Sequence, residues 1–277
     1  MKEQYNLKDI LAIKRHNKIE REDFKSSEGT WDYSDSSLFV IGSSFSKTLP
    51  KKYIENLSNN MPNSIEEYGK AFQLYIEDVL AHKKDKTAIE FGGPGSQLFS
   101  DFSPGFFKKT VGVCLADVRN SIGKEKDVKN NHVIVEGDIM DTQNKKTYDE
   151  IFYNLGTKKV DLIVSRMMGP LNEMLKIPVM LDKIVRKWYS MLEKNGIIFA
   201  QFEFFPEHRK EIEHRKRAEE VSPYKKETEE YAKKWARVLE QKFPNQIEIQ
   251  LGRGVIRLVK KDGAPDELPP GKELLNE

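Results

Sequence analysis

The chain has 277 residues, and its 46 basic and 44 acidic side chains nearly cancel to a formal charge of +2. This balance lacks the basic excess of most nucleic-acid-binding domains, so the sequence carries no strong nucleic-acid signature. Mean hydropathy is −0.64, and no apolar run approaches the ~20 residues that cross a membrane. The N-terminus has no apolar leader, and the single cysteine, Cys114, cannot form an intramolecular disulfide. We therefore expect a cytoplasmic protein without a membrane segment.

The first part of the chain shows no alternation of strands and helices. We expect residues 1–63 to form an N-terminal extension or lid, with a helix over 7–19, a short strand over 38–41 and a loop over 43–50. Its aromatic side chains either line a lid over a pocket or form a small satellite core; they are Trp31, Tyr33, Phe45 and Tyr53. A helix is predicted from about residue 64 to 81, because a serine that can cap it precedes two acids.

The most informative segment covers residues 87–96. An apolar run with Glu90 near its end is followed at once by a turn that contains Gly92, Gly93 and Gly95. Glycines can take backbone angles closed to other residues, and they leave room for a ligand to approach the backbone. Open parallel sheets bind ligands at the carboxyl ends of their strands. The segment therefore predicts a strand that delivers a nucleotide-like ligand to a glycine turn.

Four more short apolar runs follow, and helix-length spacers separate most of them. They are Lys109–Asp117, His132–Asp138, Val160–Ser165 and Gly196–Phe202, the last after a predicted helix end and turn over 191–195. This alternation predicts a mostly parallel sheet with helices on both faces. The last two runs, 246–251 and 255–260, are too close for a crossover helix and predict a hairpin. The fold class is therefore α/β, Rossmann-like, with seven strands and a reversed final strand.

The order of these motifs over about residues 64–260 resembles that of class I S-adenosylmethionine-dependent methyltransferases. The resemblance implies S-adenosylmethionine as the cofactor, with the glycine turn cradling its methionine end. It implies that the Asp117 carboxylate accepts both ribose hydroxyls and that Gly137-Asp138-Ile139 borders the adenine. The implied cofactor-binding residues are Glu90, Phe91, Gly92, Gly93, Gly95, Asp117, Val118, Asp138, Ile139 and Ser165. No catalytic residue is implied, because the sulfonium already activates the methyl group.

The acceptor is left open as a small molecule, a protein or RNA. Ser165-Arg166-Met167-Met168 stands where enzymes that methylate exocyclic amines of bases have an Asn/Asp-Pro-Pro-aromatic box. Arg166 follows the fourth strand, so it either pairs with an anionic group of the substrate or bonds a nearby acid. Glu203 ends the fifth strand and is either a substrate contact or a solvated acid.

Two other functions stay open at this stage. A catalytically inactive binding or regulatory module is consistent with the unusual Ser165-Arg166 segment and a glycine turn one residue shorter than the common form. A nicotinamide-dependent oxidoreductase is less favoured, because Gly92-Gly93-Pro94-Gly95 does not fit the Gly-x-Gly-x-x-Gly pattern. The five histidines are scattered, so no metal site is predicted.

The remaining segments are peripheral to the predicted sheet. A charged helical insertion is expected at 206–243, with an apolar stripe that includes Tyr231, Trp235 and Leu239 and packs on the sheet. Residues 261–277 are polar, contain Gly-Ala-Pro and Pro-Pro-Gly steps, and are expected to form a flexible tail.

Overall fold

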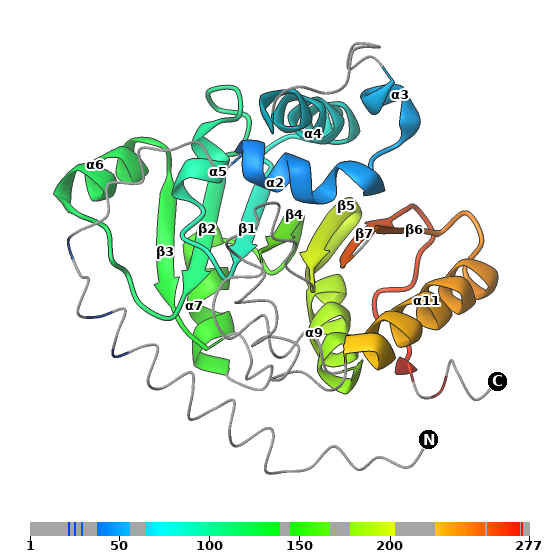
Figure 1. The fold of residues 1–277 in the computed structure, drawn as a ribbon. Coiled ribbons are helices and arrows are strands. Elements are labelled where there is room, and N and C mark those ends of the chain that lie inside the picture. Colours follow the sequence, from blue (N-terminus) through cyan, green and yellow to red (C-terminus); the bar gives the residue numbers. More distant parts are fainter. Residues whose placement is uncertain are drawn as a thin grey trace, which may run out of the picture.

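The computed structural model describes residues 38–55, 65–138, 145–166, 178–202, 225–252 and 254–271, together with the single residues 22, 25, 29 and 273. A seven-stranded sheet forms its centre (Figure 1). The strands are β1 (Thr87–Phe91), β2 (Lys109–Cys114), β3 (His132–Glu136), β4 (Val160–Ser165), β5 (Leu192–Gln201), β6 (Ile247–Gly252) and β7 (Val255–Lys260).

The strand order is β3-β2-β1-β4-β5-β7-β6. The first five strands in this order are parallel to one another, whereas β7 runs antiparallel to both β5 and β6. This order confirms the predicted Rossmann-like fold class, including the hairpin and the reversed final strand.

Helices cover both faces of the sheet (Figure 1). Alternate residues of β5 show how the faces divide, since Ile198 and Ala200 join one core and Ile197 and Phe199 join the other. The first core is covered by α7 (Lys145–Leu155), α9 (Pro178–Met191) and α11 (Lys225–Lys242). The second is covered by α2 (Leu38–Phe45), α4 (Ile65–Leu80) and α5 (Ser96–Ser100), and α6 (Ser121–Lys129) contacts β3.

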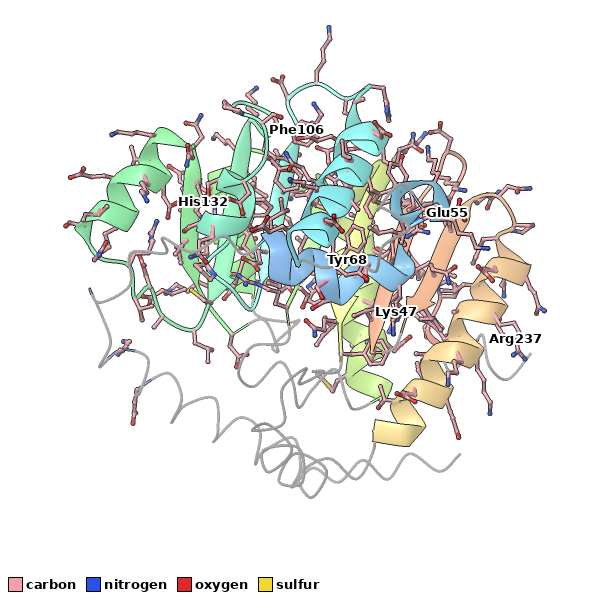
Figure 2. The ribbon with its side chains drawn as sticks, turned by 45° about the horizontal axis from the view of Figure 1, so that its top comes forward. Lys47, Glu55, Tyr68, Phe106, His132 and Arg237 are labelled. Atoms are coloured by element: carbon pink, nitrogen blue, oxygen red, sulfur yellow. The ribbon has the colours of Figure 1, made fainter. Side chains whose placement is uncertain are left out.

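The strand predicted over 38–41 and the loop predicted over 43–50 are wrong. Residues 38–45 form helix α2, followed by a 3-10 turn, η1 (Ser46–Thr48), and the short helix α3 (Lys51–Ile54). Leu38, Ile41 and Phe45 are buried at the spacing of one helix face. Gly42 lets α2 cross α4 closely, because a Cβ there would lie 2.4 Å from the Tyr68 carbonyl oxygen (Figure 2). A run of four apolar letters had hidden this helical period.

The other peripheral predictions have mixed outcomes. The helix expected from 64 to 81 is α4, and the apolar stripe of α11 packs on the first core through Trp235 and Leu239. The helix end expected near residue 191 is confirmed, because α9 ends at Met191. The turn expected up to residue 195 lies within β5, whose register against β4 shifts between Leu192 and Ile197 and where φ is +59° at Asn195. Residues 206–224 of the predicted insertion, and the predicted helix over 7–19, lie outside the described residues.

Residues 261–271 are packed against the domain and do not form a detached tail. Leu268 is buried, the Gly271 amide donates to Asp182 Oδ1 at 2.9 Å, and the Tyr189 hydroxyl donates to the Pro265 carbonyl at 2.9 Å. Asp182 and Tyr189 both belong to α9, so this segment closes over that helix.

Candidate functional site

The glycine turn after β1 folds across the end of β2. The Gly92 amide donates to the Val113 carbonyl at 2.9 Å, and φ is +81° at Gly92 and +74° at Gly95, as expected of glycines in a tight turn. The turn presses so closely on β2 that a Cβ at Gly112 would lie 1.7 Å from the Pro94 carbonyl oxygen. This fixes the backbone of the turn at the carboxyl edge of the sheet.

Glu90 lies beneath this turn and is completely buried. Its Oε1 accepts a hydrogen bond from Arg166 Nε, and the Arg166 side chain is only 14% exposed. A buried carboxylate needs such a cationic partner, because desolvation otherwise disfavours its charge. The ion pair joins the end of β1 to the residue that follows β4. Arg166 therefore bonds a nearby acid, which is one of the two roles expected for it.

Two buried polar atoms at this edge have no hydrogen-bond partner within the described part of the chain. They are Oε2 of Glu90 and Oγ of Ser165. The strand register places Phe91 of β1 directly opposite Ser165 of β4, so both atoms belong to adjacent strand ends. Buried polar atoms are nearly always satisfied in native proteins, and an exception calls for an explanation such as a missing ligand.

Asp117, beyond the end of β2, is held by Arg119. Its Oδ1 accepts from the Arg119 amide at 3.1 Å and from Nε at 2.9 Å, and its Oδ2 accepts from Nη2 at 2.7 Å. Burial would raise the pKa of Asp117, but these bonds outweigh it and lower the pKa below 3.8. A carboxylate offers about four lone-pair sites, and three of those of Asp117 are occupied. Asp117 can therefore accept from about one further donor, whereas the resemblance implied both ribose hydroxyls.

A buried carboxylate on α6 connects this acid to the glycine turn. Asp127 Oδ2 accepts from Arg119 Nη1 and from the Ser96 hydroxyl, both at 2.6 Å. Ser96 directly follows the turn, so a single side chain orients both predicted ligand-binding segments. No pattern in the sequence points to Asp127, and Arg119 stands out only as a cation two residues from an acid.

The other predicted site residues are placed as follows. Phe91 is buried and stacks on Trp188 of α9 with ring centroids 4.8 Å apart, so its side chain belongs to the core. Val118 is buried and Asp138 is half-buried near the ends of β2 and β3. Ile139 and Glu203 lie outside the described residues.

His132 of β3, which is labelled in Figure 2, anchors the glycine turn. Its Nε2 lies 2.7 Å from the Pro94 carbonyl oxygen, and its Nδ1 lies 2.7 Å from the Thr110 hydroxyl. A carbonyl oxygen only accepts, so Nε2 carries a proton, and the Thr110 hydroxyl can donate to Nδ1 of a neutral ring. Burial lowers the pKa of His132 below 6.5, although the nearby Asp127 charge opposes that effect.

The His132 environment predicts a loss of stability in mild acid. The unfolded histidine takes up a proton near pH 6.5, whereas the folded ring stays neutral to lower pH, so the free energy of unfolding falls as the pH drops through this window. Urea unfolding at about pH 8 and about pH 6 should show this fall. His132→Gln is expected to be less stable at the higher pH but less sensitive to pH. An unchanged pH sensitivity in the variant would assign the fall to other groups.

Other chemistries find no support in the described residues. They contain no cluster of three or more His, Cys, Asp or Glu side chains that could hold a metal ion. Burial raises the pKa of the Cys114 thiol to about 12, so it is not an activated nucleophile. None of the helices in the described ranges has the length and apolar character needed to span a membrane.

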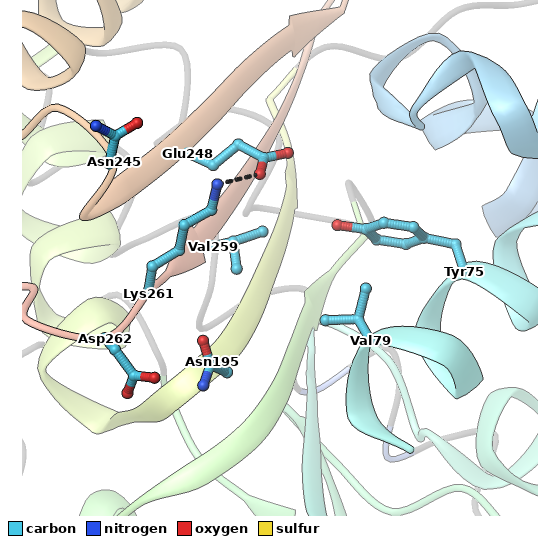
Figure 3. Close-up of a pocket in the computed structure, with 8 residues that line it drawn as sticks. All are labelled: Tyr75, Val79, Asn195, Asn245, Glu248, Val259, Lys261 and Asp262. Carbon is cyan, nitrogen blue, oxygen red and sulfur yellow. Dashed lines mark ion pairs between the residues drawn. The ribbon is translucent and has the colours of Figure 1, made fainter. Parts of the chain in front are cut away.

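A pocket of about 430 Å³ lies at the opposite, amino edge of the parallel strands (Figure 3). Its lining residues are Tyr75, Val79, Asn195, Asn245, Glu248, Val259, Lys261 and Asp262. Glu248 pairs there with Lys261 at 2.8 Å and with Arg257 at 2.6 Å. Because Glu248 and Lys261 already pair with each other and ligands of open α/β sheets bind at the carboxyl edge, the pocket is a weaker candidate than the glycine-turn site.

No family model and no curated protein matches the sequence. Among solved structures, the chain is similar to the MycE methyltransferase of the mycinamycin biosynthetic pathway, in complex with Mg and SAH (12% identity, 83% of this chain, 56% of that chain, TM-score 0.42). It is also similar to SAM-bound CalS10, an amino pentose methyltransferase from Micromonospora echinaspora (14% identity, 48% of this chain, 50% of that chain, TM-score 0.33). A third similar structure is that of the N-methyltransferase NodS from Bradyrhizobium japonicum WM9 (10% identity, 70% of this chain, 96% of that chain, TM-score 0.37).

The chain spans about half the length of the first two of these proteins. Identities and TM-scores at this level are too low to carry a conclusion about function. The strand order and the reversed β7 come from the chain's own hydrogen bonding. On that ground the chain has the fold that its resemblance to class I methyltransferases implied.

Proposed function

We propose that the chain binds S-adenosylmethionine at the carboxyl edge of β1, β2 and β4 and transfers its methyl group to an acceptor. The observation that carries the proposal is that Glu90 Oε2, near the glycine turn, and Ser165 Oγ, at the end of the neighbouring strand β4, are both buried without a hydrogen-bond partner among the described residues. An unsatisfied buried polar group costs roughly 1–3 kcal/mol. A ligand that donates hydrogen bonds to these atoms would remove that cost.

The proposed binding residues follow the strand ends. The turn at Gly92, Gly93 and Gly95 would hold the methionine end, and Asp117 would accept a ribose hydroxyl at its one remaining lone-pair site. Asp138 and Ile139 would border the adenine. These groups are binding groups, because methyl transfer from a sulfonium requires above all an in-line approach at short distance, which can lower the barrier by about 7–11 kcal/mol.

The acceptor is a small molecule, a protein or RNA, and Glu203 is the residue that we propose to contact it. An acceptor with a high pKa would also need a general base. The described residues identify none.

Calorimetric titration with S-adenosylmethionine, S-adenosylhomocysteine and NAD tests the proposal. We expect both adenosyl compounds to bind, and Asp117→Ala to lower their affinity by about tenfold or more. Unfolding midpoints of both proteins control for the loss of the partner of Arg119. Binding of NAD alone would make the chain an oxidoreductase, and binding of none of the three would leave an interaction module.

Turnover separates an enzyme from an inactive module. Release of S-adenosylhomocysteine in the presence of pooled small-molecule, protein and RNA acceptors is the expected result. Tight cofactor binding with no release on any acceptor pool would favour the binding or regulatory module.

A further inference from the structure

Arg119 is shared between two carboxylates next to the glycine turn. Its Nε and Nη2 atoms donate to Asp117 at 2.9 and 2.7 Å, and its Nη1 atom donates to Asp127 at 2.6 Å. The Asp127 side chain is 3% exposed and that of Arg119 10%, whereas that of Asp117 is 20% exposed. Two carboxylates around one guanidinium leave this cluster with one negative charge in excess.

The other charges near the cluster do not remove this excess. Glu136 accepts from the Asp117 amide at 3.0 Å, and the positive charge of Lys124 helps to lower the pKa of Asp117, so these two charges oppose each other. Both side chains are exposed, and salt therefore screens them more than the buried cluster. Burial lowers the pKa of His132, so its ring is neutral at neutral pH. Asp127 is the buried group that makes the charge around Asp117 negative.

Apolar packing does not explain why Asp127 is buried. The buried residues of α6 are Gly123 and Asp127, while Ile122 and Val128 of the same helix are 58% and 75% exposed. A buried ion pair often stabilises a fold no more than apolar side chains of similar volume would. A helix that exposes its apolar residues and buries a carboxylate therefore favours a role for this carboxylate in the ligand site.

We propose that Asp127 is a positioning residue that acts on the ligand through Arg119 without touching it. By sharing the guanidinium, Asp127 leaves Asp117 a stronger acceptor for the ribose hydroxyl than an isolated Asp117–Arg119 pair would be. Hydrogen bonds to a charged acceptor are roughly twice as strong as those between neutral groups. The inference rests on the proposed function, in which Asp117 accepts a ribose hydroxyl.

Two nucleosides that differ only in the ribose isolate this effect. Adenosine carries both hydroxyls, whereas 2′,3′-dideoxyadenosine carries neither. Calorimetric displacement of bound S-adenosylhomocysteine measures the affinity of each. We expect the wild type to bind adenosine about tenfold more tightly than the dideoxy compound, because the latter cannot donate to Asp117.

Asp127→Asn removes the excess charge but keeps an oxygen that can accept from Arg119 and Ser96. We expect the preference for adenosine to fall to about threefold or less, while the affinity for 2′,3′-dideoxyadenosine stays within about twofold of the wild type. Asp127→Ser removes the same charge and provides a second measurement if Asp127→Asn does not fold.

A second substitution should reverse the effect of the first. Adding Arg119→Gln to Asp127→Asn removes the positive charge as well, so Asp117 again carries one uncompensated negative charge. We expect this double variant to regain a preference for adenosine of about tenfold. If Asp127 only held the structure together, removing its partner as well would deepen the loss instead.

Asp182→Asn is the matched control, because Asp182 is a buried carboxylate outside the proposed binding segments. It pairs with Arg186 at 3.0 Å and accepts from the Gly271 amide at 2.9 Å. Its substitution should alter neither nucleoside affinity. A change in the adenosine preference of this variant would show that the ratio reports general loosening of the fold.

Several outcomes would overturn the inference while S-adenosylhomocysteine still binds. The wild type could bind the two nucleosides equally, in which case Asp117 does not hold the ribose. Asp127→Asn could keep the wild-type preference, with or without an equal loss of both affinities, or the double variant could fail to regain it. Either result would leave Asp127 a purely structural role. No binding of S-adenosylhomocysteine to the folded wild type would instead remove the proposed function, and this inference with it.

Discussion

Replacing Arg257 with alanine is expected to lower the free energy of unfolding by about 3 kcal/mol. The guanidinium is buried on β7, where Nε donates to the Thr48 carbonyl at 2.6 Å and Nη1 donates to the Tyr75 hydroxyl at 2.7 Å. Nη1 also pairs with Glu248 at 2.6 Å. The alanine variant leaves the buried Thr48 carbonyl without its donor, removes a cationic partner of the half-buried Glu248, and leaves a cavity between η1, α4 and the hairpin.

Urea unfolding followed by tryptophan fluorescence measures this effect, because Trp188 and Trp235 are fully buried. Lys261→Ala is the matched control. Lys261 pairs with the other oxygen of Glu248 at 2.8 Å, but it is 40% exposed, so its loss should cost less than about 1 kcal/mol. If the two substitutions lowered the free energy of unfolding equally, burial of Arg257 would add nothing to the stabilisation by its ion pair.

The Arg257 contacts also bear on the N-terminal segment. Thr48 belongs to η1, and Phe45 of α2 packs with ring centroids 5.0 Å from Phe199 of β5. The described residues 38–55 are thus part of the second core, which agrees with the core interpretation of Phe45 more than with a separate lid. Hydrogen exchange in Arg257→Ala should accordingly speed up first in α2 and α4.

The strands could be predicted because local signals and tertiary requirements agree there. The run from Thr87 to Phe91 is fully buried between two parallel neighbours, so its letters are continuously apolar apart from Glu90 and its first residue. The hairpin of β6 and β7 was predictable from the short spacing alone. Such segments need no knowledge of distant partners.

The side-chain network of the site could not be predicted, because it depends on distances between remote residues. Glu90 and Arg166 are separated by 76 positions, and only the pairing of β1 with β4 brings them together. The sequence alone leaves Arg166 as either a substrate contact or a partner of a nearby acid, and the structure shows that it bonds an acid, Glu90. His132 was one of five scattered histidines, and its contact with Pro94 has no counterpart in the local sequence.

Gly112→Ala is the second substitution with a large expected effect, because it moves the glycine turn without altering any proposed binding residue. The added methyl group would lie 1.7 Å from the Pro94 carbonyl oxygen and 2.2 Å from its carbon, and backbone cannot yield as a flexible side chain does. The turn must shift away from β2, which also strains the His132 contact with Pro94. We expect the free energy of unfolding to fall by about 1–3 kcal/mol.

The same shift should reduce affinity for S-adenosylhomocysteine by about tenfold or more, since displaced backbone groups no longer match the ligand. Val111→Ala is the control that separates the two effects. Val111 is the buried neighbour of Gly112 on β2, and its truncation should cost about 2 kcal/mol of stability without touching the turn. Calorimetry on both variants, below their unfolding transitions, should therefore find weakened binding only in Gly112→Ala. Equal binding by the two variants would mean that the turn is not part of the ligand site, whereas a selective loss would place the ligand against the backbone of residues 92–95.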